Sequence, residues 1–239
     1  QKIIITEDHS LFTIDPAAVR LITVKGSQIT QGMPIVVPFD LSATVETWKK
    51  DLEFLDLSGL VESCDGLYKR RSIVEEKRYI TNRLRRTRIP VRFPVTDDFL
   101  YIVGLWLAEG GKERDSRTTV LPFSVGGIPG AADTLRSYFQ QFKVPLKKSP
   151  YNNYDHTVAS SVFAALFRYL GLFGTAKRGE KVFPRFFWDL SHRQRRVIIA
   201  GLWDGDGGHV FKGECLLAQK CHQLIDDIYL CLSLDGIFP

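Results

Sequence analysis

Apolar residues recur every three to four positions in several stretches of the chain, which predicts amphipathic helices. Short β-branched runs between these stretches predict strands. From residue 98 the predicted order is helix, strand pair, helix, strand pair and helix, over 98–109, 117–125, 131–142, 146–158 and 160–170. A shorter copy of this order, a helix, an extended pair and a helix, follows over 191–206, 209–219 and 221–234. The pattern therefore predicts an α+β protein.

The residues before position 96 follow a different pattern. β-branched runs over 2–6, 20–25 and 34–38, interrupted by glycines, predict a β-rich segment. Residues 43–55 have helical spacing, because Val45, Trp48, Leu52 and Leu55 fall on one face. Pro90 and Pro94 then punctuate the chain, and Thr96 and Asp97 offer helix N-caps. We therefore expect four segments, at 1–42, 43–95, 96–190 and 191–239.

An internal repeat stands out within the two long predicted helices. Residues 104–111 read Gly-Leu-Trp-Leu-Ala-Glu-Gly-Gly, and residues 201–208 read Gly-Leu-Trp-Asp-Gly-Asp-Gly-Gly. Gly104 and Ala108, like Gly201 and Gly205, are four residues apart, so each helix has a stripe of small residues on one face. Two such helices can pack closely. We expect the following glycines to end each helix through a left-handed turn.

The repeat places one acid, Glu109 or Asp206, at the C-terminal end of each helix. The helix dipole is negative there, so this is a poor position for a carboxylate. Two such carboxylates brought together by helix packing would repel each other and require cations. Hard oxygen ligands suit Mg²⁺ or a similar divalent ion. An EF-hand loop over Asp204 and Asp206 does not fit, because Gly208 and His209 stand where a further ligand and the turn glycine belong.

Residues 199–207, Ile-Ala-Gly-Leu-Trp-Asp-Gly-Asp-Gly, resemble the LAGLIDADG motif of homing endonucleases almost letter for letter, and 102–110 resemble its first copy. The resemblance implies two pseudo-symmetric αββαββα halves that pack through the motif helices. It implies a metal-dependent endonuclease that cleaves both strands of DNA at a long asymmetric target site. Glu109 and Asp206 would be the catalytic acids that bind Mg²⁺ or another divalent cation.

Two lysines enter through the same resemblance. The segment 181–184, Lys-Val-Phe-Pro, is similar to the Lys-x-x-Pro element between the motifs of intein endonucleases, where the lysine is proposed to assist charge stabilisation or water activation. Lys181 would take that catalytic role, against the alternative of an ordinary surface lysine. Lys220 stands where the family often has a basic or amide residue. The corresponding stretch near Ser124 and Val125 has no lysine, so any such assistance would be asymmetric.

The N-terminal segment resembles part of an intein splicing (Hint-like) domain. Thr6-Glu7-Asp8-His9 looks like its Thr-x-x-His element, in which Thr6 and His9 would polarise a scissile peptide. A surface-loop histidine is the alternative. No Cys or Ser opens the chain and no His-Asn pair closes it, so we expect no splicing by this chain alone. The second half also stops after one strand pair and a helix, so we expect it to be truncated or completed by a second polypeptide.

The positive charge is concentrated in two stretches. Ten basic and two acidic residues lie between 69 and 92, within a net charge of +5 for the chain. Seven basic and two acidic residues lie between 177 and 196. Such stretches are often only solvated faces, but this density is also typical of surfaces that bind phosphates. The predicted DNA-binding residues are Lys69, Arg70, Arg71, Arg83, Arg85, Arg86, Arg88, Lys177 and Arg178.

Other features limit the function classes. The longest apolar run is too short for a membrane span, and the N-terminus lacks a signal-peptide pattern. We expect a cytoplasmic, nucleoid-associated protein with reduced cysteines. A zinc site at His209, Cys215, Cys221 and His222 is disfavoured by its spacing. The alternatives to an intein endonuclease are a nuclease-inactive LAGLIDADG-derived maturase or regulator, and a split or degraded splicing element.

Overall fold

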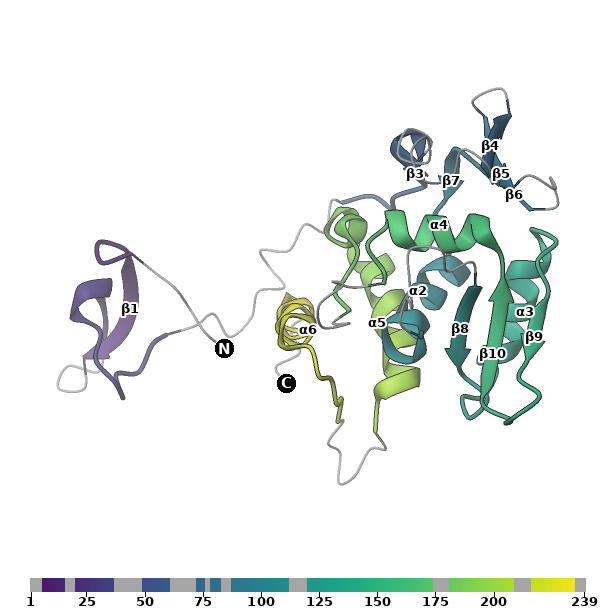
Figure 1. Cartoon of the computed structure of the whole chain (residues 1–239). Helices are drawn as coiled ribbons and strands as arrows, with labels where there is room; N and C mark the ends of the chain where they lie inside the picture. Colours follow the sequence, from purple (N-terminus) through teal and green to yellow (C-terminus); the bar gives the residue numbers. More distant parts are fainter. Residues whose placement is uncertain are drawn as a thin grey trace. The chain divides into compact units, whose positions relative to one another are not determined.

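The computed structural model is mixed α and β, which confirms the predicted class (Figure 1). It describes residues 6–15, 20–36, 49–60, 72–75, 78–82, 87–111, 120–173, 181–208 and 216–234. The chain forms two compact units, residues 1–45 with 229–239 and residues 46–228. Within the described part, no helix is long and apolar enough to cross a membrane.

The first unit contains an antiparallel hairpin. Strand β1 (Ser10–Asp15) pairs with β2 (Arg20–Lys25), and the short 3-10 helix η1 (Gly26–Gln28) follows. Strand β2 was predicted, whereas β1 was not. Pro34 to Val36 form no strand, although the Val36 amide donates to the Phe12 carbonyl at 2.9 Å. The strand predicted over 2–6 lies almost wholly outside the described residues.

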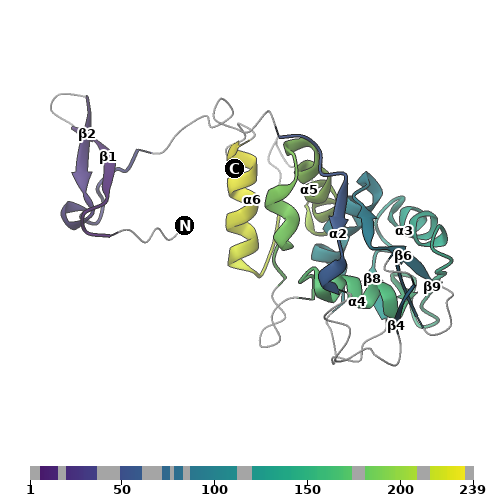
Figure 2. The ribbon, with the colours of Figure 1, turned by 90° about the horizontal axis from the view of Figure 1, so that it is seen from above.

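Helices α2 (Asp97–Glu109) and α5 (His192–Asp206) form the centre of the second unit and lie side by side (Figures 1 and 2). The Thr96 hydroxyl caps α2 by accepting from the Phe99 amide, as the sequence predicted. Ser191 and Gln194 form a reciprocal capping box at the start of α5. The 3-10 helix η3 (Arg185–Asp189) leads into that cap.

A three-stranded antiparallel sheet packs beside α2. Its strands, in spatial order, are β8 (Val120–Ser124), β10 (Asp155–Ala159) and β9 (Leu146–Lys148). Helices α3 (Ala131–Gln140) and α4 (Ser161–Tyr169) complete this half, and α6 (His222–Leu234) follows α5 along the chain.

The two faces of this sheet differ. Phe123 pairs with His156 and Leu121 with Val158, and all four side chains are buried. Their neighbours along the strands are less buried, because successive side chains alternate between faces. Asp155 and its partner Ser124 lie on this more open face.

Trp106 of α2 anchors the helix to its surroundings. Its ring is fully buried and meets Phe123, Phe167 and Phe173 edge-on, with centroids 5.1 to 5.2 Å apart. Its indole nitrogen donates to the Leu172 carbonyl at 2.7 Å, so the buried polar atom is satisfied. The tryptophan therefore fixes the last turn of α2, which carries Glu109.

The helix predicted over 43–55 is wrong for its described part. Residues 49–53 have no regular structure, and β3 (Phe54–Asp56) pairs with β7 (Arg92–Pro94). Gln194 binds both backbone groups of Leu52, at 2.8 and 2.9 Å. These tertiary partners satisfy the backbone in an extended form, which outweighs a weak helical preference. Residues 43–48 lie outside the described part.

A small antiparallel meander carries part of the basic stretch. It consists of β4 (Ser72–Glu75), β5 (Tyr79–Asn82) and β6 (Arg88–Pro90). The exposed Arg88 lies over the Tyr79 ring at 5.6 Å from its centroid.

Candidate active site

The stripes of small residues are where α2 and α5 meet. A side chain at Gly104 would overlap the Ile198 carbonyl oxygen and lie 2.7 Å from the Leu202 amide nitrogen. A side chain at Gly201 would reach the backbone of Tyr101 in the same way, with its carbonyl carbon at 3.0 Å. Backbone atoms cannot move aside, so only glycine permits this approach. The close packing predicted from the sequence is confirmed.

This packing brings the two predicted acids together. A Cβ at Gly205 would overlap that of Ala108 and lie 3.1 Å from Glu109 Cγ, so Glu109 lies beside the last turn of α5. Asp206 is the next residue of that turn, and its charge raises the pKa of Glu109. The helix pair thus places both carboxyl groups at one end.

Both acids have pKa values above their ordinary range. For Glu109 the causes are burial and then Asp206, opposed by Lys181 and reinforced by Asp155. For Asp206 the cause is burial, opposed by Lys181 and by a hydrogen bond from Gln219. Ionising both groups is therefore costly, since each loses hydration near a like charge. A bound cation would favour the doubly ionised pair.

The glycines after the acids do not form the left-handed turns that the sequence suggested. Gly110 has φ −69° and ψ 138°, and Gly207 has φ −74° and ψ 137°, which is extended backbone. The reason for glycine is space. A Cβ at Gly110 would overlap the Trp106 ring, and one at Gly207 would lie 2.6 Å from the Trp203 ring. In each motif, the glycine after the acid therefore leaves room for the tryptophan of the same motif.

The repeat continues beyond the octet. Gly110 forms an antiparallel bridge with Phe123, and Gly207 forms one with Leu217. The next glycines behave alike, because Gly111 donates to the Pro122 carbonyl at 2.9 Å and Gly208 to that of Leu216 at 2.7 Å. After each motif helix, a later part of the chain therefore pairs with the two glycines that follow the acid.

Lys181 lies at the C-terminal end of α2. Its ammonium nitrogen donates to the carbonyl oxygens of Trp106 at 2.7 Å, Ala108 at 3.4 Å and Gly110. An ammonium has three N–H donors, and the last carbonyls of a helix lack partners within it. The lysine therefore caps α2 with a positive charge that acts on Glu109 and Asp206 together.

In the second half, Gln219 contacts Asp206, and the predicted catalytic lysine, Lys220, is the next residue along the chain. The Gln219 amide donates to an Asp206 carboxylate oxygen, while Lys220 is exposed. Strand alternation explains the difference, because Gln219 shares a side with Leu217, which pairs with Gly207. The sequence alone could not identify Gln219 as this contact, because the contact depends on the pairing of Leu217 with Gly207.

Asp204, the other acid of the second motif, is not part of the pair. It accepts a hydrogen bond from the Tyr101 hydroxyl at 2.7 Å, which links α5 to α2. Burial and this carboxylate raise the pKa of Tyr101, so the phenol stays protonated. Asp204 therefore stabilises the helix pair.

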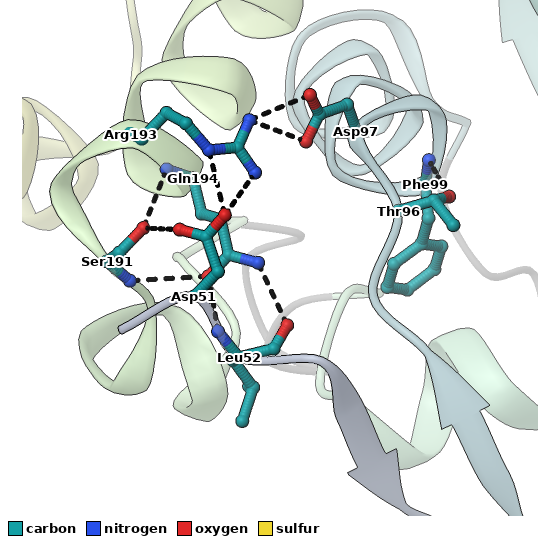
Figure 3. Close-up of polar contacts among 8 residues, drawn as sticks. All are labelled: Asp51, Leu52, Thr96, Asp97, Phe99, Ser191, Arg193 and Gln194. Atoms are coloured by element: carbon teal, nitrogen blue, oxygen red, sulfur yellow. Dashed lines mark hydrogen bonds and ion pairs between the residues drawn. The ribbon is translucent and has the colours of Figure 1, made fainter. Parts of the chain in front are cut away.

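The opposite end of the helix pair carries a network of complementary charges (Figure 3). The Nη1 nitrogen of Arg193 in α5 donates to both carboxylate oxygens of Asp97 at the start of α2, at 2.9 and 2.8 Å. Arg193 also binds Asp51, which accepts from the Ser191 hydroxyl. Hydrogen bonds from Arg193 and Ser191 hold the pKa of Asp51 below its ordinary value.

The other predicted residues are placed as follows. Most of the predicted DNA-binding residues lie outside the described part, namely Lys69, Arg70, Arg71, Arg83, Arg85, Arg86, Lys177 and Arg178. Thr6 and His9 are exposed and close a turn, in which the His9 amide donates to the Thr6 carbonyl at 3.1 Å. No interaction that would assign them a splicing role follows from this turn.

Among the described residues, no group of three or more His, Cys, Asp or Glu residues could hold a metal ion. Of the disfavoured zinc set, Cys221 is buried, His222 is exposed, and His209 and Cys215 lie outside the described part. Within the part of the chain that the structure describes, a cation at the acid pair would therefore find two carboxylates, those of Glu109 and Asp206.

No known protein family model matches the chain, and no curated protein is significantly similar to it.

Proposed function

We propose that this protein is a metal-dependent DNA endonuclease of the LAGLIDADG type. The observation that carries the proposal is the placement of Glu109 and Asp206, which meet at one end of two duplicated, glycine-packed helices. The motif resemblance agrees with this placement. The element order after α2 supports an αββαββα first half, with the bridge at Gly110 at the place of its first strand.

The acid pair fits a magnesium site. Mg²⁺ binds hard oxygens and is commonly held by one or two carboxylates, with water and substrate phosphate as the other ligands. Two partly buried carboxylates with raised pKa values gain from such an ion. When bound, a divalent cation would supply Lewis-acid activation and charge neutralisation for phosphodiester hydrolysis.

The residues around the acids position them in different ways. Lys181 donates to the carbonyls before and after Glu109, which holds the end of α2 and lowers the cost of ionising both acids. Since its ammonium donates hydrogen bonds to carbonyls at the end of α2, we assign Lys181 a positioning role. Gln219 orients the Asp206 carboxylate. The two strands of a DNA duplex would therefore meet catalytic acids that have different neighbouring residues.

Double-stranded DNA is the proposed partner. The basic stretches would bind phosphates, and of their described members Arg88 is exposed and backed by Tyr79. We propose that the N-terminal segment, with Thr6 and His9, derives from an intein splicing domain, and that the protein acts in the cytoplasm.

The test is cleavage of a plasmid pool with randomised inserts in Mg²⁺ buffer, followed by sequencing of the ends. We expect discrete double-strand breaks, which Glu109→Gln abolishes for one or both strands while DNA binding remains. Glu53→Gln, which alters an exposed acid elsewhere in the same unit, is the control and should cleave normally. Unchanged nicking by E109Q would refute the assignment. Binding without cleavage by the wild type would favour the nuclease-inactive alternative.

A further inference from the structure

The turn between β9 and β10 exposes two large aromatic rings. Tyr151 is 93% exposed and Tyr154 62%, and they are among the most exposed large hydrophobic side chains in the described part of the chain. Exposed apolar groups gathered on one surface commonly mark binding sites, and tyrosine is enriched where proteins bind partners. The exposure of Tyr151 and Tyr154 therefore indicates a binding site at this turn.

The turn that carries these rings is well fixed. The Asn152 side chain accepts from the amides of Tyr154 and Asp155 at 3.0 and 2.8 Å, and donates to the Asp155 carboxylate at 2.7 Å. The Ser149 amide donates to the Asp155 carbonyl at 2.8 Å. A preorganised turn loses little conformational entropy on binding, so its rings can act as rigid anchors.

The turn that follows β8 supports the β9–β10 turn. The Gly126 amide donates to the Tyr154 carbonyl at 2.8 Å, and a Cβ at Gly126 would overlap the Asn153 carbonyl oxygen. The Tyr154 ring lies 3.8 Å from the Cβ position of Gly127. Tyr154 is therefore backed by the protein on one side, whereas Tyr151 is the free-standing ring.

The charge around the turn favours a polyanion. Lys143, Lys147 and Lys148 are exposed, and residues 140–154 contain no acid. The nearest carboxylate, Asp155, accepts hydrogen bonds from Ser124 and Asn152. Aromatic rings flanked by lysines are the combination by which proteins hold nucleic-acid strands, with bases on the rings and phosphates on the cations.

The turn also lies near the acid pair. Gly110, the residue after Glu109, forms a bridge with Phe123, and the next residue of that strand, Ser124, pairs with Asp155, which ends the turn and begins β10. A strand whose scissile phosphate reached Glu109 would therefore pass within reach of the turn. A tyrosine stacks on a base only where the base has left its own stack, as beside a kinked or opened step.

We propose that the β9–β10 turn is a DNA contact in which Tyr151 stacks on an unstacked base beside the cleaved phosphate, while Lys147, which pairs with Thr157 on the more open face, holds a neighbouring phosphate. This rests on the proposed endonuclease function. The turn would therefore bind opened DNA more tightly than intact duplex.

The test compares the full chain with its variants on a fluorescein-labelled duplex of arbitrary sequence, fully paired or with a short central bubble. The bubble carries 2-aminopurine, whose fluorescence reports stacking. We expect the wild type to bind bubble DNA more tightly and to quench 2-aminopurine. Tyr151→Ala should weaken bubble binding about 5- to 100-fold and abolish quenching. Tyr151→Phe keeps the ring and should bind like the wild type.

The contribution of the lysine charge is tested by measuring how DNA affinity depends on salt concentration. Lys147→Gln should reduce the slope of log affinity against log salt by about one, on both DNAs alike. Lys50→Gln, an exposed lysine away from the turn, should leave binding unchanged. Circular dichroism confirms that each variant folds.

The outcomes separate the two proposals. Unchanged bubble binding by Y151A, or an equal loss of binding to heparin, which has no bases, overturns the contact and leaves the endonuclease proposal standing. Tyr151-dependent bubble binding without cleavage supports the contact and counts against the endonuclease. A wild type that binds neither DNA overturns both.

Discussion

The two ends of the α2–α5 pair are built on opposite electrostatic principles. At the N-terminal end Arg193 lies between Asp51 and Asp97, so every charge of that network faces an opposite one. At the C-terminal end Glu109 and Asp206 lie together, where burial raises the pKa of both acids and the charge of Asp206 raises that of Glu109 further. The network at the N-terminal end stabilises the packing of the two helices. The like-charged acids at the C-terminal end destabilise it, and the rest of the helix contact holds them in place. This contrast is typical of functional sites.

The largest effect should come from the glycines that both ends depend on. Gly104→Ala or Gly201→Ala would place a Cβ against backbone atoms of the facing helix. We expect each to destabilise the fold by about 3 kcal/mol, measured by urea unfolding. Gly127→Ala is the control, because its nearest neighbours would lie at 3.8 Å. Equal stability of all three variants would contradict the close packing.

Removing Arg193 should have a smaller effect. Arg193→Met leaves two carboxylates without their cation, and we expect a loss of about 1 kcal/mol because the network is half exposed. The pKa of Asp51 is lowered in the folded state, so this stabilisation is present above its ordinary pKa and is lost as the pH falls through the folded value. Thermal unfolding from neutral to acidic pH should show the two proteins converging. A constant difference would argue for packing instead of charge.

The acid end should respond in the opposite direction. The pKa of Glu109 is raised, so its ionisation destabilises the metal-free fold as the pH rises through the folded value. We therefore expect Glu109→Gln to raise the melting temperature slightly at neutral pH, by about 1–3 °C, and to have no such effect in strong acid. Mg²⁺ should stabilise the wild type more than E109Q. A lower melting temperature for E109Q at neutral pH would show that the pair is not strained.

The smallest effect concerns the balance of charge within the acid end. Lys181→Met should raise the pKa values of both Glu109 and Asp206 further, because its cation lowers both. Carbon-13 NMR of the two carboxyl groups measures this directly, and the acidic limb of any cleavage profile should move with them. Lys181→Arg keeps the charge and should retain most of the wild-type titration. Unshifted carboxyl groups in the methionine variant would remove Lys181 from the site.

The sequence pattern predicted the structure correctly where several local preferences agree. The caps at Thr96 and Ser191, the ends of both motif helices and the glycine stripes all follow from spacing and local chemistry. It failed where backbone groups found distant partners. Residues 49–55 have helical spacing, yet Gln194 and β7 hold them extended.

The sequence by itself determined that two duplicated helices would each end in an acid and could pack closely, because a repeat with small residues four apart encodes both. Only the tertiary structure decided which groups surround those acids. It brought Lys181 to the end of α2, placed Gln219 on Asp206, and showed that the glycines make room for tryptophans. These contacts join segments far apart in the chain or depend on strand register, which spacing along the chain does not encode.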